Sequence, residues 1–318
     1  MEKDNFFKNA FINTIANKKS KYEFTEYEEN VFSQHGQDGV LKKLFSKINC
    51  LENITTFEVG GWDGVTLSNT CNLLKNHDAF SIFVEANKKK FEVLLKNHSK
   101  EIASGKVLAL NEFLTPQGLS SPSKILKRAG ISDLDFISID VDGMDYFILR
   151  DLDISPKVIL IEYNYTFHPN VEFVQPQDYK VNWGSSSSAV LKLAEKKGYG
   201  LVHFFETDLL LVRKDIIKNY NLKTIESYEV FSKANGFFGF GYDGTLLMFG
   251  DSKNKGPNCP WVSAQFSPTN FQFLPSFLRF FVSKKDFTEY FKWVLRNLYL
   301  KKYKEIIKKT RELLFRKN

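Results

Sequence analysis

The sequence predicts an α/β fold with a doubly wound, mostly parallel seven-stranded sheet of Rossmann-like type that ends in an antiparallel hairpin. Short apolar runs typical of strands alternate with segments of helical periodicity. The last two of these runs have only the segment ETD between them. The strand-like runs occupy residues 54–60, 80–86, 105–110, 134–140, 157–163, 199–205 and 208–214.

The connections between these runs predict how the strands pair. Helix-length segments separate the first five runs, which indicates βαβ units and helices on both faces of a parallel sheet. Helix ends are recognisable, because Ser121–Pro122 and the serine run 185–188 precede two helices that Gly130 and Gly198 follow. ETD is too short for a crossover helix, so the last two strands must pair antiparallel. Five parallel strands and a terminal hairpin are typical of class I methyltransferases, which favours S-adenosylmethionine over NAD.

Charge is concentrated near the carboxyl end. The chain has 318 residues and a net charge of +7, and residues 284–318 carry twelve Lys/Arg against four Asp/Glu, or +8. The remaining, nearly neutral body argues against nucleic acid as a partner. The tail has helical apolar spacing among its lysines. It could lie on an anionic membrane, pack on the body or bind a partner.

The cysteine spacing and the N-terminal sequence indicate the compartment, and the order of the predicted elements indicates the domain boundaries. The three cysteines show no CxxC spacing and no signal-peptide pattern is visible, so we expect a cytoplasmic protein, with peripheral contact at the inner membrane face as a possible role of residues 284–318. We predict an N-terminal helical segment over 1–30 and a cofactor-binding domain over 31–218. A C-terminal extension with basic amphipathic helices would cover 219–318. The oligomeric state is not predicted.

The stretch TFEVGGWDG places glycines and carboxylates at the end of the first strand. Gly60 and Gly61 leave room for a ligand to approach the backbone, and the spacing differs from the GxGxxG of dinucleotide sites. Glu58 and Asp63 would repel a phosphate but suit a ligand that bears an ammonium group. Glu85 closes the second strand, where a carboxylate can accept both ribose hydroxyls. An ordinary strand-to-helix turn is the alternative.

Several blocks between residues 32 and 214 resemble the FkbM-like family of S-adenosylmethionine-dependent methyltransferases, whose members often O-methylate sugars of polysaccharides or natural products. The resemblance implies that Glu58, Gly60 and Asp63 hold the amino-acid end of the cofactor and that Glu85 holds its ribose. It does not extend to the last hundred residues. The blocks are FSQHGQDGVLKKLF, FEVGGWDGVTLSNT, LDFISIDVDGMDYFIL, VILIEYN and LKLAEKKGYGLV.

SQHGQDG precedes the first strand, where related folds place a helix that closes over the cofactor. Gln34 and Asp38 are therefore candidate contacts of the methionine moiety or of the acceptor. Alternatively, Ser33 and Gln34 only cap a helix over 37–47.

Acidic and amide side chains follow the fourth and fifth strands. Because neighbouring parallel strands end at the same edge, these groups should lie together beside the cofactor turn, where their mutual repulsion calls for a cation. Oxygen ligands of this kind match Mg²⁺, which would make a bound hydroxyl a better nucleophile. In the alternative, the aspartates cap turns. The candidate metal ligands are Asp140, Asp142, Glu162 and Asn164, and Asp140 is also a candidate cofactor contact.

Methyl transfer to oxygen needs a proton acceptor, and three residues are candidates. His168 follows the fifth strand and is the first choice, ahead of Asp142, with Asp140 beside them. His77, His98 and His203 are expected on the surface or on an edge strand. An exposed or structural role is the alternative for any single histidine.

The long connection 167–188 between the fifth strand and its helix is expected to carry acceptor specificity. Aromatic residues in this connection and just before it could stack on a sugar, or they could form a small core of their own. These residues are Tyr163, Tyr165, Phe167, Tyr179 and Trp183.

Together these patterns predict an S-adenosylmethionine-dependent O-methyltransferase that acts on a sugar hydroxyl of a polysaccharide, a lipid-linked glycan or a glycosylated metabolite. The alternative is a catalytically silent module of the same fold that acts through its basic tail. An NAD-dependent sugar oxidoreductase is a further rival.

Overall fold

The computed structural model describes residues 22–165, 167, 169–230, 236–240 and 246–250. Three predicted features lie outside these residues: most of the N-terminal segment 1–30, the candidate base His168 and the basic helices of 284–318. No helix among the described residues is both long and apolar enough to cross a membrane.

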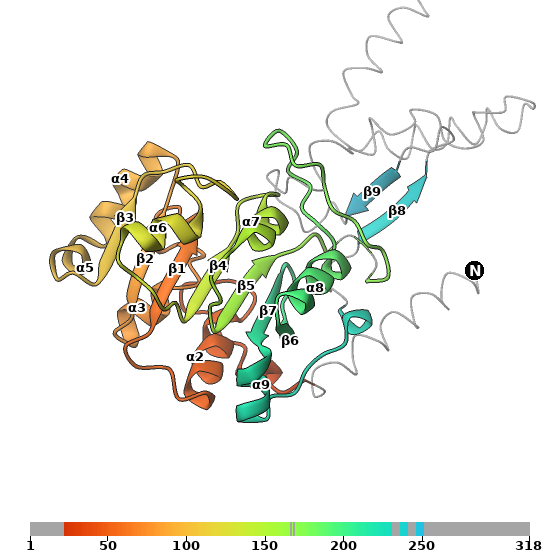
Figure 1. Cartoon of the computed structure of the whole chain (residues 1–318), viewed down its shortest axis with the longest axis horizontal. Helices are drawn as coiled ribbons and strands as arrows, with labels where there is room; N and C mark the ends of the chain where they lie inside the picture. Colours follow the sequence, from red (N-terminus) through yellow and green to blue (C-terminus); the bar gives the residue numbers. More distant parts are fainter. Residues whose placement is uncertain (1–21, 166, 168, 231–235, 241–245, 251–318) are drawn as a thin grey trace, which may run out of the picture. The chain divides into compact units, whose positions relative to one another are not determined.

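The main sheet has the predicted seven strands, in the order β3-β2-β1-β4-β5-β7-β6 (Figure 1). β1 to β5 are parallel, and β7 pairs antiparallel with both β5 and β6. This confirms the predicted class I methyltransferase architecture. The strands are β1 (Thr55–Val59), β2 (Phe80–Val84), β3 (Val107–Leu110), β4 (Phe136–Ile139), β5 (Val158–Glu162), β6 (Tyr199–Phe204) and β7 (Asp208–Arg213).

The helices begin and end largely where the sequence signals stand. Ser186 Oγ accepts a hydrogen bond from the N–H of Ala189 at the start of α8, and Gly130 and Gly198 adopt positive φ just past α6 and α8. The helices are α2 (Gln37–Lys47), α3 (Cys71–Asn76), α4 (Lys88–Asn97), α5 (Ser99–Ala103), α6 (Pro122–Arg128), α7 (Asp145–Asp151), α8 (Ser187–Lys196) and α9 (Lys214–Tyr220), with short 3₁₀ turns η1 (Thr25–Tyr27) and η2 (Ser227–Glu229).

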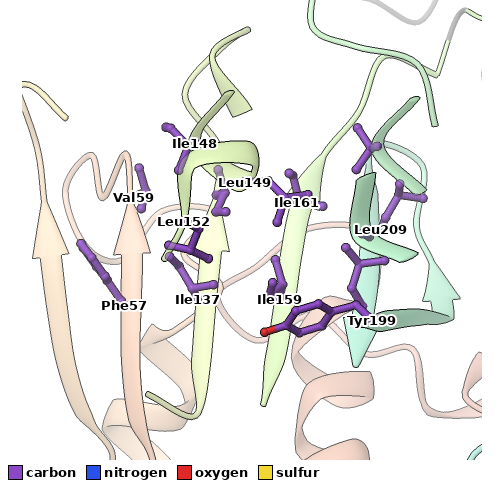
Figure 2. Close-up of a cluster of buried hydrophobic side chains, with 14 of the residues drawn as sticks. Phe57, Val59, Ile137, Ile148, Leu149, Leu152, Ile159, Ile161, Tyr199 and Leu209 are labelled. Atoms are coloured by element: carbon purple, nitrogen blue, oxygen red, sulfur yellow. The ribbon is translucent and has the colours of Figure 1, made fainter. Parts of the chain in front are cut away.

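Helices cover both faces of the sheet, which explains why its strands are almost continuously apolar. On one face, α6, α7 and α8 pack on inward-facing residues such as Ile137 and Ile159, and Figure 2 shows Ile148 and Leu149 of α7 lying over these strands. On the other face, α2, α3 and α9 pack on residues such as Phe136 and Leu160, and α4 covers the β2–β3 end. The two layers hold the strand ends in fixed register.

Packing also extends past the predicted domain limits. Phe24 is fully buried in the cluster around α2, and Leu222, Ile225 and Val230 are buried beyond residue 218. A second, two-stranded antiparallel sheet consists of β8 (Gly236–Phe240) and β9 (Leu246–Gly250).

Candidate active site

A cavity of about 430 Å³ lies at the carboxyl ends of the parallel strands. Ligands of open α/β sheets bind at this edge. The lining residues come from the carboxyl ends of β1, β2 and β4 and from the segments after β1, β2, β3 and β4, together with Gln34 and Tyr179. Five carboxylates take part: Glu58, Glu85, Glu112, Asp140 and Asp142.

The turn after β1 fits tightly between the neighbouring strands. The N–H groups of Gly60 and Gly61 both donate to the carbonyl of Val84, at 3.1 and 3.0 Å. Gly60 has φ +83°, and a Cβ atom there would lie 2.2 Å from the carbonyl oxygen of Asp140. Only glycine can therefore occupy this position without moving the backbone at the floor of the cavity.

Glu58 lines the cavity, but its carboxylate is already engaged by the chain itself. It accepts hydrogen bonds from Ser68 Oγ at 2.6 Å, from the Asn69 N–H at 3.0 Å and from Thr70 Oγ1. Burial raises the pKa of Glu58, and these hydrogen bonds oppose the rise. In the described structure Glu58 fixes the segment 68–70. Its contact with a cofactor stays a prediction.

Asp63 is not among the residues that line the cavity. Its carboxylate accepts from the N–H groups of Val65 and Thr66, at 2.9 and 2.7 Å, and from Thr66 Oγ1. Burial would raise the pKa of Asp63, but these hydrogen bonds outweigh it and the pKa is lowered. The side chain thus stabilises the turn, as the Asx pattern D-x-x-T allows.

One histidine near this turn is placed differently from the expectation. His98 is fully buried rather than on the surface, and its ring stacks on Phe83 with centroids 5.0 Å apart. Its Nε2 lies 2.7 Å from the carbonyl oxygen of Gly64. The helical pattern of α4 does not predict the burial of His98, because this burial depends on contact with Gly64, which is far away in the sequence.

Glu85 stands where the second strand ends, as predicted, and it lines the cavity. It is 8% exposed, and its two oxygens accept from the N–H groups of Trp62, at 2.9 Å, and Asn87, at 2.6 Å. Each carboxylate oxygen has two lone pairs, so each retains one acceptor position. The carboxylate is therefore held rigidly and can still receive two hydroxyl groups.

Gln34 and Asp38 are separated by the structure. Gln34 lines the cavity, whereas Asp38 is buried and its Oδ2 accepts from the N–H groups of Val31, Phe32 and Ser33, at 2.7–2.8 Å. The N-cap of α2 is Gly36, with φ +88° and no side chain to cap the helix, but Ser33 Oγ accepts from the N–H of Asp38 in the first turn at 2.9 Å, as the alternative reading expected. Asp38 folds the preceding segment back on α2 and thereby positions Gln34.

Three carboxylates meet at the ends of β4 and β5. Asp140, Asp145 and Glu162 each offer an oxygen within 4.8 Å of the other two. Asp145 also accepts from the N–H groups of Val141 and Gly143, both at 2.9 Å, and Glu162 Oε2 has no hydrogen-bond partner among the described residues. Asp145 is not among the metal ligands predicted from the sequence.

The other two predicted ligands are placed differently. Asp142 is exposed, with φ +53°, and lines the cavity rather than joining this cluster. Asn164 is fully buried and its Nδ2 donates to the carbonyl of Trp183 at 2.7 Å. Their roles as metal ligands stay predictions.

The acidic cluster strongly perturbs the titration of its members. Burial first, and the neighbouring carboxylates second, raise the pKa of Asp140 and of Glu162 well above their ordinary values. Burial raises the pKa of Asp145 to about 6, against the effect of its hydrogen bonds from Val141 and Gly143. The cluster therefore favours a bound proton or a bound cation.

We expect this cluster to make the protein less stable as the pH rises from about 4 to 6. Because the pKa of Asp145 is about 6 when folded and 3.8 ordinarily, the unfolded chain loses this proton first. Stability is thus greatest below the ordinary pKa and levels off above the folded one. Urea unfolding across this window measures the slope. Asp145→Asn should reduce it, and the exposed Asp153→Asn should not. If the free energy of unfolding changes with pH in the same way for the wild type and both variants, the raised pKa of Asp145 is contradicted.

The cavity rim gathers exposed apolar side chains. Of the nine large hydrophobic residues that are exposed among those described, four line it: Trp62, Leu67, Phe113 and Tyr179. A concentration of this kind marks a ligand site more than ordinary surface. Lys90 is the single basic side chain among the described lining residues, and its Nζ lies 4.8 Å from the centre of the Trp62 ring.

Most aromatic residues predicted for acceptor stacking are buried instead. Tyr163, Tyr165 and Phe167 are at most 8% exposed, and Phe167 stacks on Phe173 with centroids 4.5 Å apart. Tyr179 differs, since it is 52% exposed and lies at the cavity. Glu112 and Phe113, which follow β3, also line the cavity. The sequence reading missed both, although their place after a strand end was the available signal.

The chain was compared with protein-family models, curated proteins and solved structures. No family model matches the chain, and no curated protein does. Among solved structures, it is similar to M. capricolum TrmK in complex with S-adenosylhomocysteine (17% identity, 54% of this chain and 66% of that chain, TM-score 0.33). Precorrin-6y C5,15-methyltransferase from Geobacter metallireducens (18%, 54% and 84%, 0.32) and Rickettsia typhi PKMT2 with AdoHcy (12%, 55% and 52%, 0.38) are also similar. At this level the matches carry no information on the reaction or the substrate.

Proposed function

We propose that this protein is an S-adenosylmethionine-dependent methyltransferase. The order of side chains along the edge of the sheet supports this most directly. Phe113 follows β3, Glu85 ends β2, and Glu58 and Asp140 belong to the ends of β1 and β4, which are neighbours in that order. A ligand with a flat base, a diol and then a cationic end matches this series. These are the adenine, ribose and sulfonium-ammonium parts of S-adenosylmethionine.

The same cavity suits NAD poorly. A diphosphate needs N–H donors and basic side chains, whereas the described lining offers five carboxylates and a lysine that already lies on Trp62. Like charges in a cavity of this size would repel one another. The carboxylates of the lining therefore fit a cationic ligand without phosphate groups.

The chain's own residues would perform binding, positioning and proton transfer. Bound S-adenosylmethionine supplies an electrophilic methyl group. Glu85 would hold the ribose hydroxyls, and the carboxylates at the β1 and β4 ends would orient the cationic end. Positioning of this kind supplies much of the rate enhancement of an in-line displacement. Asp140 lines the cavity and is a further candidate to accept the proton of the attacking group. His168 stays the first predicted base and Asp142 the second.

We further propose that the acceptor is a sugar hydroxyl of a polysaccharide, a lipid-linked glycan or a glycosylated metabolite. The resemblance in sequence blocks supports this class, as does a site lined by hydrogen-bond acceptors rather than basic groups. Cytoplasmic location and membrane contact through residues 284–318 also stay predictions. The silent-module alternative depends on that same tail, which lies outside the described residues.

A divalent cation is a second element of the proposal. Three carboxylates with oxygens within 4.8 Å, one of them the unpartnered Glu162 Oε2, fit the oxygen preference of Mg²⁺. A cation would also offset the mutual repulsion that raises the pKa values of Asp140 and Glu162. Asp140, Asp145 and Glu162 would hold it, next to the proposed methyl-transfer position.

Transfer of a labelled methyl group from S-adenosylmethionine to cell-envelope glycan fractions tests the proposed function. We expect incorporation that a chelator abolishes and Mg²⁺ restores, and that Glu162→Gln reduces by at least about tenfold. The exposed Glu172→Gln, outside the cavity lining, is the control. Incorporation that is unchanged by the chelator would contradict the proposed metal requirement. A side chain of the protein would then have to act as the base alone. Absence of incorporation into every glycan fraction would contradict the carbohydrate acceptor.

A further inference from the structure

Part of the β5–α8 connection forms a self-contained loop, residues 173–184, which we call the strap. Gln175 is 2% exposed and lies at its centre. Its Oε1 accepts from the N–H groups of Trp183 and Gly184, at 2.9 and 2.8 Å, and its Nε2 donates to the carbonyl of Val181 at 2.8 Å. A buried amide that satisfies three backbone groups gives this loop a defined shape.

The strap is packed tightly on the turn after β4. Gly143 in that turn has φ +123°, and a Cβ atom there would lie 2.8 Å from Gln175 Oε1 and 2.9 Å from the Cα of Asn182. The backbones can approach this closely only because residue 143 is glycine. The part of the strap around Gln175 and Asn182 is thus fixed beside the turn that contains Asp142, one of the residues that line the cavity.

The tip of the strap reaches the opposite end of the cavity. The Tyr179 ring meets the Phe113 ring edge to face, with centroids 5.2 Å apart and planes at 66°. Phe113 follows β3, which is separated from β5 by three strands of the sheet, β2, β1 and β4. Both rings line the cavity, and both remain more than half exposed, at 59% for Phe113 and 52% for Tyr179.

We propose that Tyr179 is a binding residue for the base of the adenosyl group and that the strap thereby supplies one wall of the cofactor site. Two rings at 66° form a corner and not a pair of parallel plates. A flat heteroaromatic ring can stack on one face of this corner and meet the other ring edge-on, the two geometries that aromatic groups prefer. This inference rests on the proposed function.

The position of Tyr179 in the cavity distinguishes a contact with the adenosyl base from stacking on the acceptor. The strand order puts Glu85 between the Phe113 end of the cavity and the carboxylates of β1 and β4. If Glu85 holds the ribose, the base lies on the Phe113 side and the reacting end lies on the Asp140 side. Tyr179 is therefore remote from the proposed transfer position, although the strap belongs to a connection expected to bind the acceptor.

Binding of S-adenosylhomocysteine and of adenosine to the full chain tests the inference by calorimetry. Tyr179→Ala should weaken both ligands equally, by about fivefold to tenfold, and Tyr179→Phe should stay within about twofold of the wild type. Tyr228→Ala is the matched control, because Tyr228 is 61% exposed and lies outside the cavity lining. Thermal unfolding of each variant checks folding.

The outcomes distinguish the two proposals. If wild-type protein binds neither ligand, the proposed function fails and the inference with it. If wild-type protein binds both and Tyr179→Ala binds them unchanged, the inference alone is overturned. Loss confined to S-adenosylhomocysteine would also overturn it, because a residue that covers the base must affect adenosine.

Discussion

Gly60→Ala is expected to abolish detectable binding of S-adenosylhomocysteine and to lower the free energy of unfolding by at least about 2 kcal/mol. Position 60 has φ +83°, and the new methyl group would lie 2.2 Å from the carbonyl oxygen of Asp140. That oxygen belongs to backbone and cannot rotate away as a flexible side chain could. Relief therefore requires the ends of β1 and β4 to separate, which distorts the floor of the cavity.

Gly118→Ala is the matched control for this substitution. Gly118 has a similar φ of +89°, and a Cβ atom there would meet nothing within 4 Å. The two variants share the backbone strain and differ in the steric contact. Calorimetry should show a loss of binding for Gly60→Ala alone. Urea unfolding should show the larger loss of stability for the same variant. Equal binding by both variants would mean that the glycine turn does not shape the site.

Glu85→Ala is expected to weaken S-adenosylhomocysteine binding by about 100-fold, because hydrogen bonds to a charged group contribute about 1.5–3 kcal/mol. The carboxylate is 8% exposed and is held by the N–H groups of Trp62 and Asn87. Its removal deletes the proposed ribose acceptor and releases the Trp62 end of the glycine turn. Isothermal titration with the same ligand measures the change.

Two further variants make the result for Glu85 interpretable. Glu85→Gln retains one acceptor oxygen and should show an intermediate affinity. Asp215→Ala removes a carboxylate that accepts from Arg213, at the end of β7. β7 runs antiparallel to β5, so this residue lies at the opposite edge of the sheet from the cavity. An affinity for Glu85→Ala equal to that of Asp215→Ala would remove Glu85 from the site.

The sheet could be predicted because its determinants are local or depend on connection length. Buried parallel strands give continuous apolar runs, and the segment between β6 and β7 is too short for a helix, which requires the antiparallel end. Glu85 could be placed at the cavity for the same reason, since it ends a strand. Residues at the ends of neighbouring strands converge wherever this fold forms.

Side-chain partners could not be predicted from such patterns. Asp63 and Asp38 read as cofactor ligands in the sequence, yet their oxygens accept hydrogen bonds from nearby backbone N–H groups. A carboxylate can accept from nearby backbone N–H groups, and the sequence pattern does not show which carboxylates do so. The contact between Tyr179 and Phe113 has no local signal at all, because it depends on how the strap folds around Gln175.

The central claim is that the cavity accepts a phosphate-free adenosyl ligand that carries an ammonium group. Calorimetric titration of the wild-type protein with S-adenosylhomocysteine and, in parallel, with NAD⁺ tests it most directly. We predict micromolar binding of S-adenosylhomocysteine and binding of NAD⁺ that is weaker by at least about 100-fold. Tighter binding of NAD⁺, or no heat from S-adenosylhomocysteine at millimolar concentration, would contradict the claim.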